Sequence, residues 1–176
     1  MTADQTDHPS PSRHLLRHTV ATLAYRAEKV LRDAPDAFVR HRISPASRSP
    51  LEIVSHLGDL VEWADRMAHG EYLWAPQPAD DWTGACDRFF HGLLALDASL
   101  ADSTFEKYSP EVIFQGPIAD ALTHVGQLAM IRGALSAPVR PESYARAEIF
   151  VGRVGREQSS TRKEFEGDAS RRRPKS

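Results

Sequence analysis

The sequence has a single cysteine, Cys86, among 176 residues, and this scarcity excludes several kinds of site. One thiol cannot form an intramolecular disulfide, and it cannot supply the several thiolates of a structural zinc or iron–sulfur site. Cys86 recurs with large apolar residues at helical spacing. We therefore interpret it as a small core side chain and not as a reactive thiol.

Long apolar runs and an excess of positive charge are also missing. No stretch approaches the ~18 consecutive apolar residues that a membrane helix needs. The polar first twelve residues have no apolar centre and do not match a secretory signal, so we expect a cytoplasmic protein without membrane contact. Twenty-two Lys and Arg stand against 24 Asp and Glu, for a formal net charge of -2. This balance argues against a domain-wide basic surface for nucleic acid.

The apolar residues that are present follow helical spacing. They recur every three or four residues in four segments, the pattern of helices with one buried face. These segments begin near His14, Pro50, Asp81 and Pro117. Ser49, Pro50 and Glu52 suit the N-cap, first and third positions of the second helix. The sequence predicts an all-α protein, a four-helix bundle with an irregular C-terminal arm.

Composition divides the chain into four parts. We expect a disordered leader at residues 1–12, the bundle at 13–137, an arm packing on the bundle at 138–156, and a basic disordered tail at 157–176. A basic end of this kind can bind nucleic acid or an anionic membrane, but we interpret it as a solvated tail.

Two of the eight histidines stand out from their surroundings. His56 lies at the margin of the apolar stripe of the second helix, and His124 lies inside that of the fourth. A histidine among aliphatic side chains needs hydrogen-bond partners for both ring nitrogens, or a metal. Asp120 precedes His124 by one helical turn, within the ~5–6 Å that separates such neighbours.

These residues allow two interpretations. In the first, Asp120, His124 and a facing His56 share one divalent cation and leave positions open on it, as a catalytic zinc, nickel or iron site requires. In the second, Asp120 and His124 form a hydrogen-bonded pair and His56 is satisfied separately. His91 forms a similar pair with Asp87 but lies off the apolar stripe, so we expect it to be exposed.

The nearby residues Gly126 and Gln127 have structural interpretations as well. Gly126 would allow close approach of a neighbouring helix. Gln127 would hydrogen-bond a ligand or a helix end.

The segment Asp120-Ala-Leu-Thr-His124-Val-Gly126-Gln127-Leu128 resembles the last-helix motif of the DinB/YfiT-like superfamily, His-x-x-x-His-x-Gly-Gln followed by an apolar residue. The run Glu52-Ile-Val-Ser-His56-Leu resembles the place of that superfamily's first histidine. The resemblance covers about residues 14–137. It implies an up-down-down-up bundle, often a homodimer, with a divalent metal held by three histidines.

His56 and His124 match the first and last ligands of this superfamily, and Asp120 stands where the middle histidine usually is. A carboxylate lowers the net charge of such a site and favours cations that prefer oxygen.

Some relatives transfer low-molecular-weight thiols such as bacillithiol or mycothiol, and others isomerise maleylpyruvate. The resemblance therefore implies a metal-dependent enzyme for a small-molecule substrate, using a small thiol or activated water, of the thiol S-transferase or hydrolase type. The alternative is a non-catalytic, stress-related bundle that acts by binding or dimerisation, with or without a structural metal.

Overall fold

The computed structural model describes residues 10–79, 81–102 and 107–165. Within these ranges the protein is all-α, and its only β pairing is an isolated antiparallel bridge between Glu142 and Glu164. The helices are α1 (Pro11–Leu31), α2 (Asp36–Val39), α3 (Pro50–Ala68), α4 (Trp82–Ala101), α5 (Pro110–Ile113) and α6 (Ala119–Ala134). A π-helical turn, η1 (Phe114–Ile118), and a 3-10 turn, η2 (Tyr144–Arg146), complete the set.

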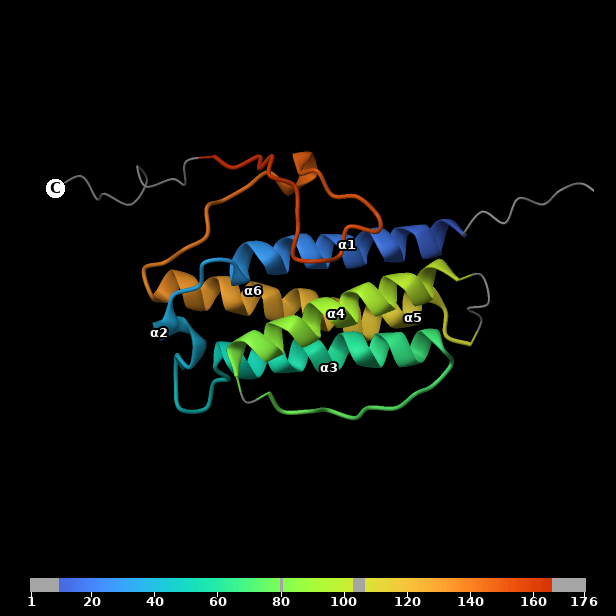
Figure 1. The fold of residues 1–176 in the computed structure, drawn as a ribbon, viewed down its shortest axis with the longest axis horizontal. Helices are drawn as coiled ribbons and strands as arrows, with labels where there is room; N and C mark the ends of the chain where they lie inside the picture. The colour runs from blue at the N-terminus through green and yellow to red at the C-terminus, as the bar shows by residue number, and fades with distance from the viewer. Residues whose placement is uncertain (1–9, 80, 103–106, 166–176) are drawn as a thin grey trace, which may run out of the picture.

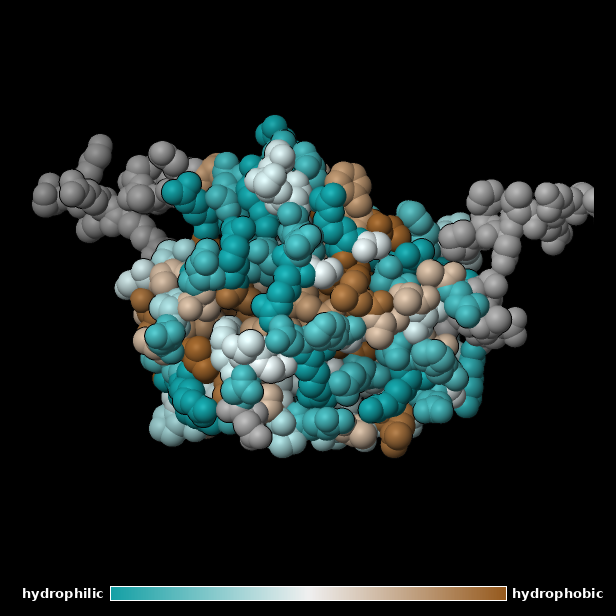
Figure 2. Space-filling view, in the orientation of Figure 1, coloured by the Kyte–Doolittle hydropathy of each residue, from teal (hydrophilic) through white to brown (hydrophobic). Residues whose placement is uncertain are grey.

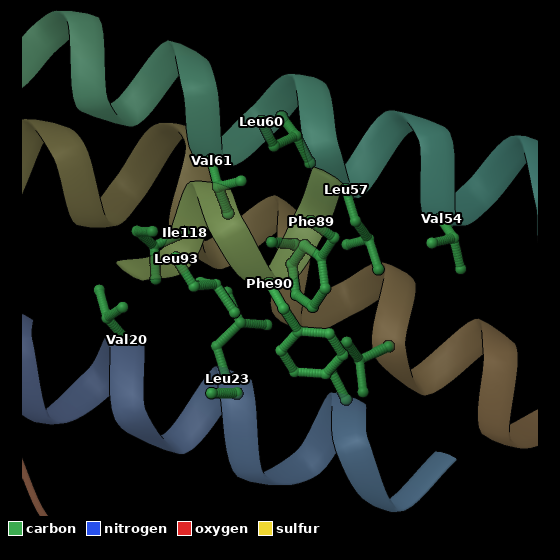
Figure 3. Packing of buried hydrophobic residues seen from close by; sticks show 14 of the residues in the cluster. Val20, Leu23, Val54, Leu57, Leu60, Val61, Phe89, Phe90, Leu93 and Ile118 are labelled. Atoms are coloured by element: carbon green, nitrogen blue, oxygen red, sulfur yellow. The ribbon is translucent and has the colours of Figure 1, made fainter. Parts of the chain in front are cut away.

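The four long helices pack side by side around one hydrophobic core (Figure 1). α3 contacts α4 and α6, and α1 contacts the same two helices on its inner side. Figure 3 shows side chains from α1, α3 and α4 meeting at the centre. Among the labelled residues, Leu23, Leu57, Phe89 and Leu93 are fully buried. The apolar stripes predicted for these helices are therefore confirmed as the core.

The predicted start of α3 is confirmed by its hydrogen bonds. The Ser49 hydroxyl accepts from the Glu52 N–H, and the Glu52 carboxylate accepts from the Ser49 N–H at 2.7 Å. These reciprocal bonds satisfy two of the backbone donors that the first turn leaves unpaired. Cys86 of α4 is 2% exposed, and its burial raises the pKa of its thiol to about 11. This confirms Cys86 as a core residue.

The last helical segment begins earlier than we predicted. Helical structure starts at Pro110 instead of Pro117 and continues through η1 into α6. Proline lacks the N–H that an α-helix interior requires, and its ring crowds the preceding turn. The wider π turn accommodates Pro117 inside this helical run. α2 was not predicted either, although its Phe38 is fully buried.

Both ends of the described chain are more ordered than we predicted. α1 begins at Pro11 and is N-capped by Ser10, so the helix includes two residues assigned to the leader. Within residues 157–165, which were assigned to the tail, Arg162 and Glu164 instead pair with Glu28 and Lys29 of α1. The assignment was wrong there because the charged residues that indicated solvation are paired with α1. The rest of the leader and the basic end of the tail lie outside the described residues.

The C-terminal segment (residues 138–165) runs over the outside of α1 (Figure 1). Its Glu142 is buried and accepts hydrogen bonds from the Tyr25 hydroxyl at 2.5 Å and the Lys29 ammonium at 2.6 Å. Lys29 also pairs with Glu164 at 2.8 Å. Farther along, Val154 enters the hydrophobic core. Ion pairs and apolar contacts together hold this segment in place.

The face of the molecule that carries this segment is mostly hydrophilic, with scattered hydrophobic side chains (Figure 2). None of the helices in the described ranges combines the length and the apolar character needed to cross a membrane.

Candidate metal centre

His56, Asp120 and His124 come together between α3 and α6. Asp120 Oδ2 lies 3.4 Å from His56 Nε2, and Asp120 Oδ1 lies 3.6 Å from His124 Nε2. The two imidazole rings are 4.8 Å apart between centroids and nearly perpendicular. One carboxylate thus faces both imidazoles, as the first interpretation expects. The second interpretation was wrong, because Asp120 lies within hydrogen-bond distance of His56 and not of His124.

Helix geometry explains this convergence. His56 lies in the second turn of α3, and Asp120 and His124 lie one turn apart near the start of α6. Residues four apart on a helix project from the same face. Because α3 packs against α6 and η1, that face meets His56.

The spacing of the three side chains fits a divalent cation. One candidate ligand atom from each residue lies within 4.8 Å of the other two. Two ligands at ~2.1 Å from a zinc ion and at a tetrahedral angle stand about 3.4 Å apart. The two nitrogen–oxygen distances, one to each oxygen of the Asp120 carboxylate, are close to this value. The donor set of two imidazoles and one carboxylate suits zinc, nickel or iron.

Gln127 orients the His124 ring. Its side-chain oxygen Oε1 lies 2.9 Å from His124 Nδ1. An amide oxygen only accepts, so Nδ1 carries the proton and the lone pair of Nε2 faces Asp120. Metal-binding histidines in proteins are commonly held by such a second hydrogen bond. This role agrees with the expectation that Gln127 hydrogen-bonds a ligand.

The surroundings of His56 favour its neutral form. Burial is the largest cause that lowers the pKa of its imidazole. The neighbouring Arg48 and His124 lower this pKa further, against the opposing effect of Asp120. A neutral ring has the lone pair that metal binding requires. His56 is 17% exposed and His124 12%, whereas Asp120 is 48% exposed, so the site opens to solvent beside the carboxylate.

The connector between α3 and α4 brings Trp74 to the site. Its described part (residues 69–79) runs back along α3 (Figure 1). Its Gln77 N–H donates to Asp59 at 2.9 Å, and its Gln77 carbonyl accepts from the Ser55 hydroxyl at 2.9 Å. Trp74 then stands edge-on to His56, with 5.7 Å between ring centroids. The indole forms an aromatic wall next to the imidazole.

Two open grooves flank the pair of histidines. The first has a volume of about 470 Å³ and includes His56, Trp74 and Gln77. The second, about 410 Å³, includes His124, Gln127 and Met130. Arg48 lines both grooves.

The predictions for His91 and Gly126 have different outcomes. His91 is exposed, as predicted. The interpretation of Gly126 was wrong, since a Cβ added there would have no atom within 4 Å and no helix approaches closely. Arg48 and Trp74 were missed because both lie outside the helices, where no periodic signal indicates which way a side chain faces.

Comparisons with known proteins give no further guide to this site. No protein-family model matches the chain, and no curated protein or solved structure matches it either.

Proposed function

We propose that this protein binds a divalent cation through His56, Asp120 and His124 and uses it to transfer a small thiol to an electrophilic substrate. The observation that carries the proposal is the convergence of three candidate ligand atoms within 4.8 Å of one another. The Gln127 hydrogen bond and the neutral His56 ring support it, because both prepare nitrogen lone pairs for a metal.

The fold that we propose is the up-down-down-up bundle of the DinB/YfiT-like superfamily. The motif around His124 and the connector that returns along α3 support this assignment (Figure 1). A connector of that length lets α4 start beside the beginning of α3, near Ser55 and Gln77. The homodimer that the resemblance implies belongs to the same proposal, and sedimentation velocity tests it.

The proposed reaction joins the sulfur of a small thiol to an electrophilic carbon. A bound divalent cation would lower the pKa of a thiol or water in contact with it, so that a nucleophile exists near neutral pH. The S–H bond breaks and an S–C bond forms. The bond from that carbon to its leaving group breaks as well, and the leaving group and the proton are released. Asp120 and the two histidines would hold the cation, Gln127 would fix His124, and the grooves would receive the reactants.

The alternative is a non-catalytic bundle that binds a structural metal or none. The carboxylate in place of a third histidine favours it, because a less positive centre lowers the pKa of a bound nucleophile less.

Metal analysis tests the site first. Protein purified without a metal column and incubated with Zn²⁺ should hold about one zinc per chain after desalting. His124→Ala should lose it, and His91→Ala, which removes an exposed histidine, should retain it. A wild-type protein that holds no zinc would overturn the proposal.

A second measurement separates the catalytic and non-catalytic versions. Zinc-loaded wild type should accelerate the reaction of N-acetylcysteine with 1-chloro-2,4-dinitrobenzene, with release of chloride and a proton. His124→Ala should not. Stoichiometric zinc without acceleration would support the structural-metal alternative.

A further inference from the structure

Arg48 occupies the boundary between the two grooves at the candidate metal centre. It comes from the loop before α3, and it is the residue that the linings of both grooves share in the described part of the chain. His56 borders the first groove and His124 the second. A molecule lying along either groove toward the histidines therefore passes the Arg48 side chain.

The charge of Arg48 is not neutralised by a neighbour. Among the described residues no hydrogen bond or ion pair engages its guanidinium. Glu52, in the same groove, is paired with Arg42 at 2.5 Å and accepts from the Ser49 N–H. Asp59 is paired with Arg88 at 2.7 Å. An exposed, unpaired guanidinium can receive a carboxylate through two parallel hydrogen bonds.

The grooves also restrict the rest of the ligand. The second groove is lined by Ile43, Ile53, Met130 and Ile131, which suit an apolar body. One positive charge next to this apolar lining matches a ligand with one negative charge.

The geometry points to Arg48 as the anchor for a small, apolar substrate that carries a single carboxylate. The carboxylate binds the guanidinium, and the apolar part lies against Ile43, Ile53 and Met130. This inference rests on the proposed function only where it calls the ligand a substrate. With its carboxylate on Arg48, the reactive group of the ligand would lie beside His56 and His124.

The test uses metal-free protein, so its outcome does not depend on the cation. Binding of 3-phenylpropionate and of the uncharged 3-phenylpropan-1-ol is measured by NMR titration of the full chain. Wild type should bind the carboxylate about tenfold more tightly, as expected for one charge-assisted hydrogen-bonded pair. Arg48→Gln should bind both probes equally, and Arg48→Lys should retain part of the preference.

Arg146→Gln is the matched control, because it removes an exposed arginine from η2 and should keep the full preference. Equal binding of the two probes by wild type would overturn the inference, as would a preference that survives in Arg48→Gln. Phenyl phosphate binding more tightly than 3-phenylpropionate would overturn the assignment of a carboxylate. Failure of zinc binding, measured separately, would remove the proposed function and leave this anchor intact.

Discussion

At the scale of single residues, the contact between Gln127 and His124 has the clearest energetic consequence for the candidate metal centre. The amide oxygen accepts from Nδ1 at 2.9 Å and so selects the tautomer whose Nε2 faces Asp120. Without this bond the ring can turn or place its proton on the wrong nitrogen. Metal binding would then also have to order the ring, and the affinity for the metal would be lower.

Gln127→Ala should therefore weaken zinc binding by about 10- to 100-fold. Competition with a chromogenic chelator measures the affinity. Gln115→Ala removes an exposed glutamine from η1 and should bind zinc as the wild type does. An unchanged affinity in Gln127→Ala would show that the hydrogen bond does not orient a ligand.

The site residues differ in how far the sequence predicts them. Asp120 and His124 could be paired because four residues make about one helical turn. His56 could be added because it borders the apolar stripe of a second helix. Arg48 could not be found in this way, because a loop side chain has no periodic environment, and its position depends on how the loop packs.

At the scale of elements, the close approach of α3 and α4 depends on Gly92. A Cβ added at Gly92 would lie 2.6 Å from Val61 Cγ2, a distance that real Cβ atoms essentially never show. Glycine within a helix costs roughly 0.5–1 kcal/mol relative to alanine. The close packing of the two helices compensates for that cost.

Gly92→Ala should lower the free energy of unfolding by about 1–3 kcal/mol, because the helices must separate or Val61 must move. Gly126→Ala is the matched substitution, since a Cβ there meets no atom within 4 Å. It should raise stability by about 0.5–1 kcal/mol and leave zinc binding unchanged. Urea denaturation measures both variants, and equal stabilities would contradict the steric argument.

Helix starts were predictable where a serine–proline pair was recognised as a cap. Ser49 and Pro50 open α3 as expected, and the same pair, Ser10–Pro11 or Ser109–Pro110, opens α1 and α5. We placed the last start at Pro117 because proline commonly begins a helix and seldom continues one. The π turn that accommodates Pro117 depends on local packing, so composition and periodicity could not predict it.

At the scale of the whole molecule, the C-terminal segment is joined to α1 through the buried charge of Glu142. Burial by itself would raise the pKa of this carboxyl, but hydrogen bonds from Lys29, Tyr25 and the Lys163 N–H hold it below its usual value. Burial and the bond to Glu142 raise the pKa of Tyr25 to about 12. The sequence indicated a packed arm here but not which charges would be buried.

Glu142→Gln should destabilise the protein by about 3 kcal/mol at pH 7, the lower end for a broken buried ion pair because Lys29 keeps Glu164 as a partner. The folded-state pKa of Glu142 is lowered, so its contribution is fully present above the usual glutamate pKa of about 4.3. It is lost as the pH falls through the folded-state value.

Urea denaturation from pH 7 down to pH 3 tests this dependence. The difference between wild type and Glu142→Gln should shrink toward the acid end. Glu157→Gln, which changes an exposed carboxylate of the same segment, should track the wild type throughout. A difference that stays constant with pH would exclude the ionised carboxylate as its source.

The buried thiol of Cys86 has a practical consequence for all of these measurements. With the native sulfur enclosed and its pKa near 11, maleimide and iodoacetamide reagents will find almost no thiolate on the folded wild-type chain. A cysteine introduced at exposed Ser44 would then be the one labelled position, next to Ile43 of the second groove. A fluorophore there would report ligand occupancy without first rebuilding the core.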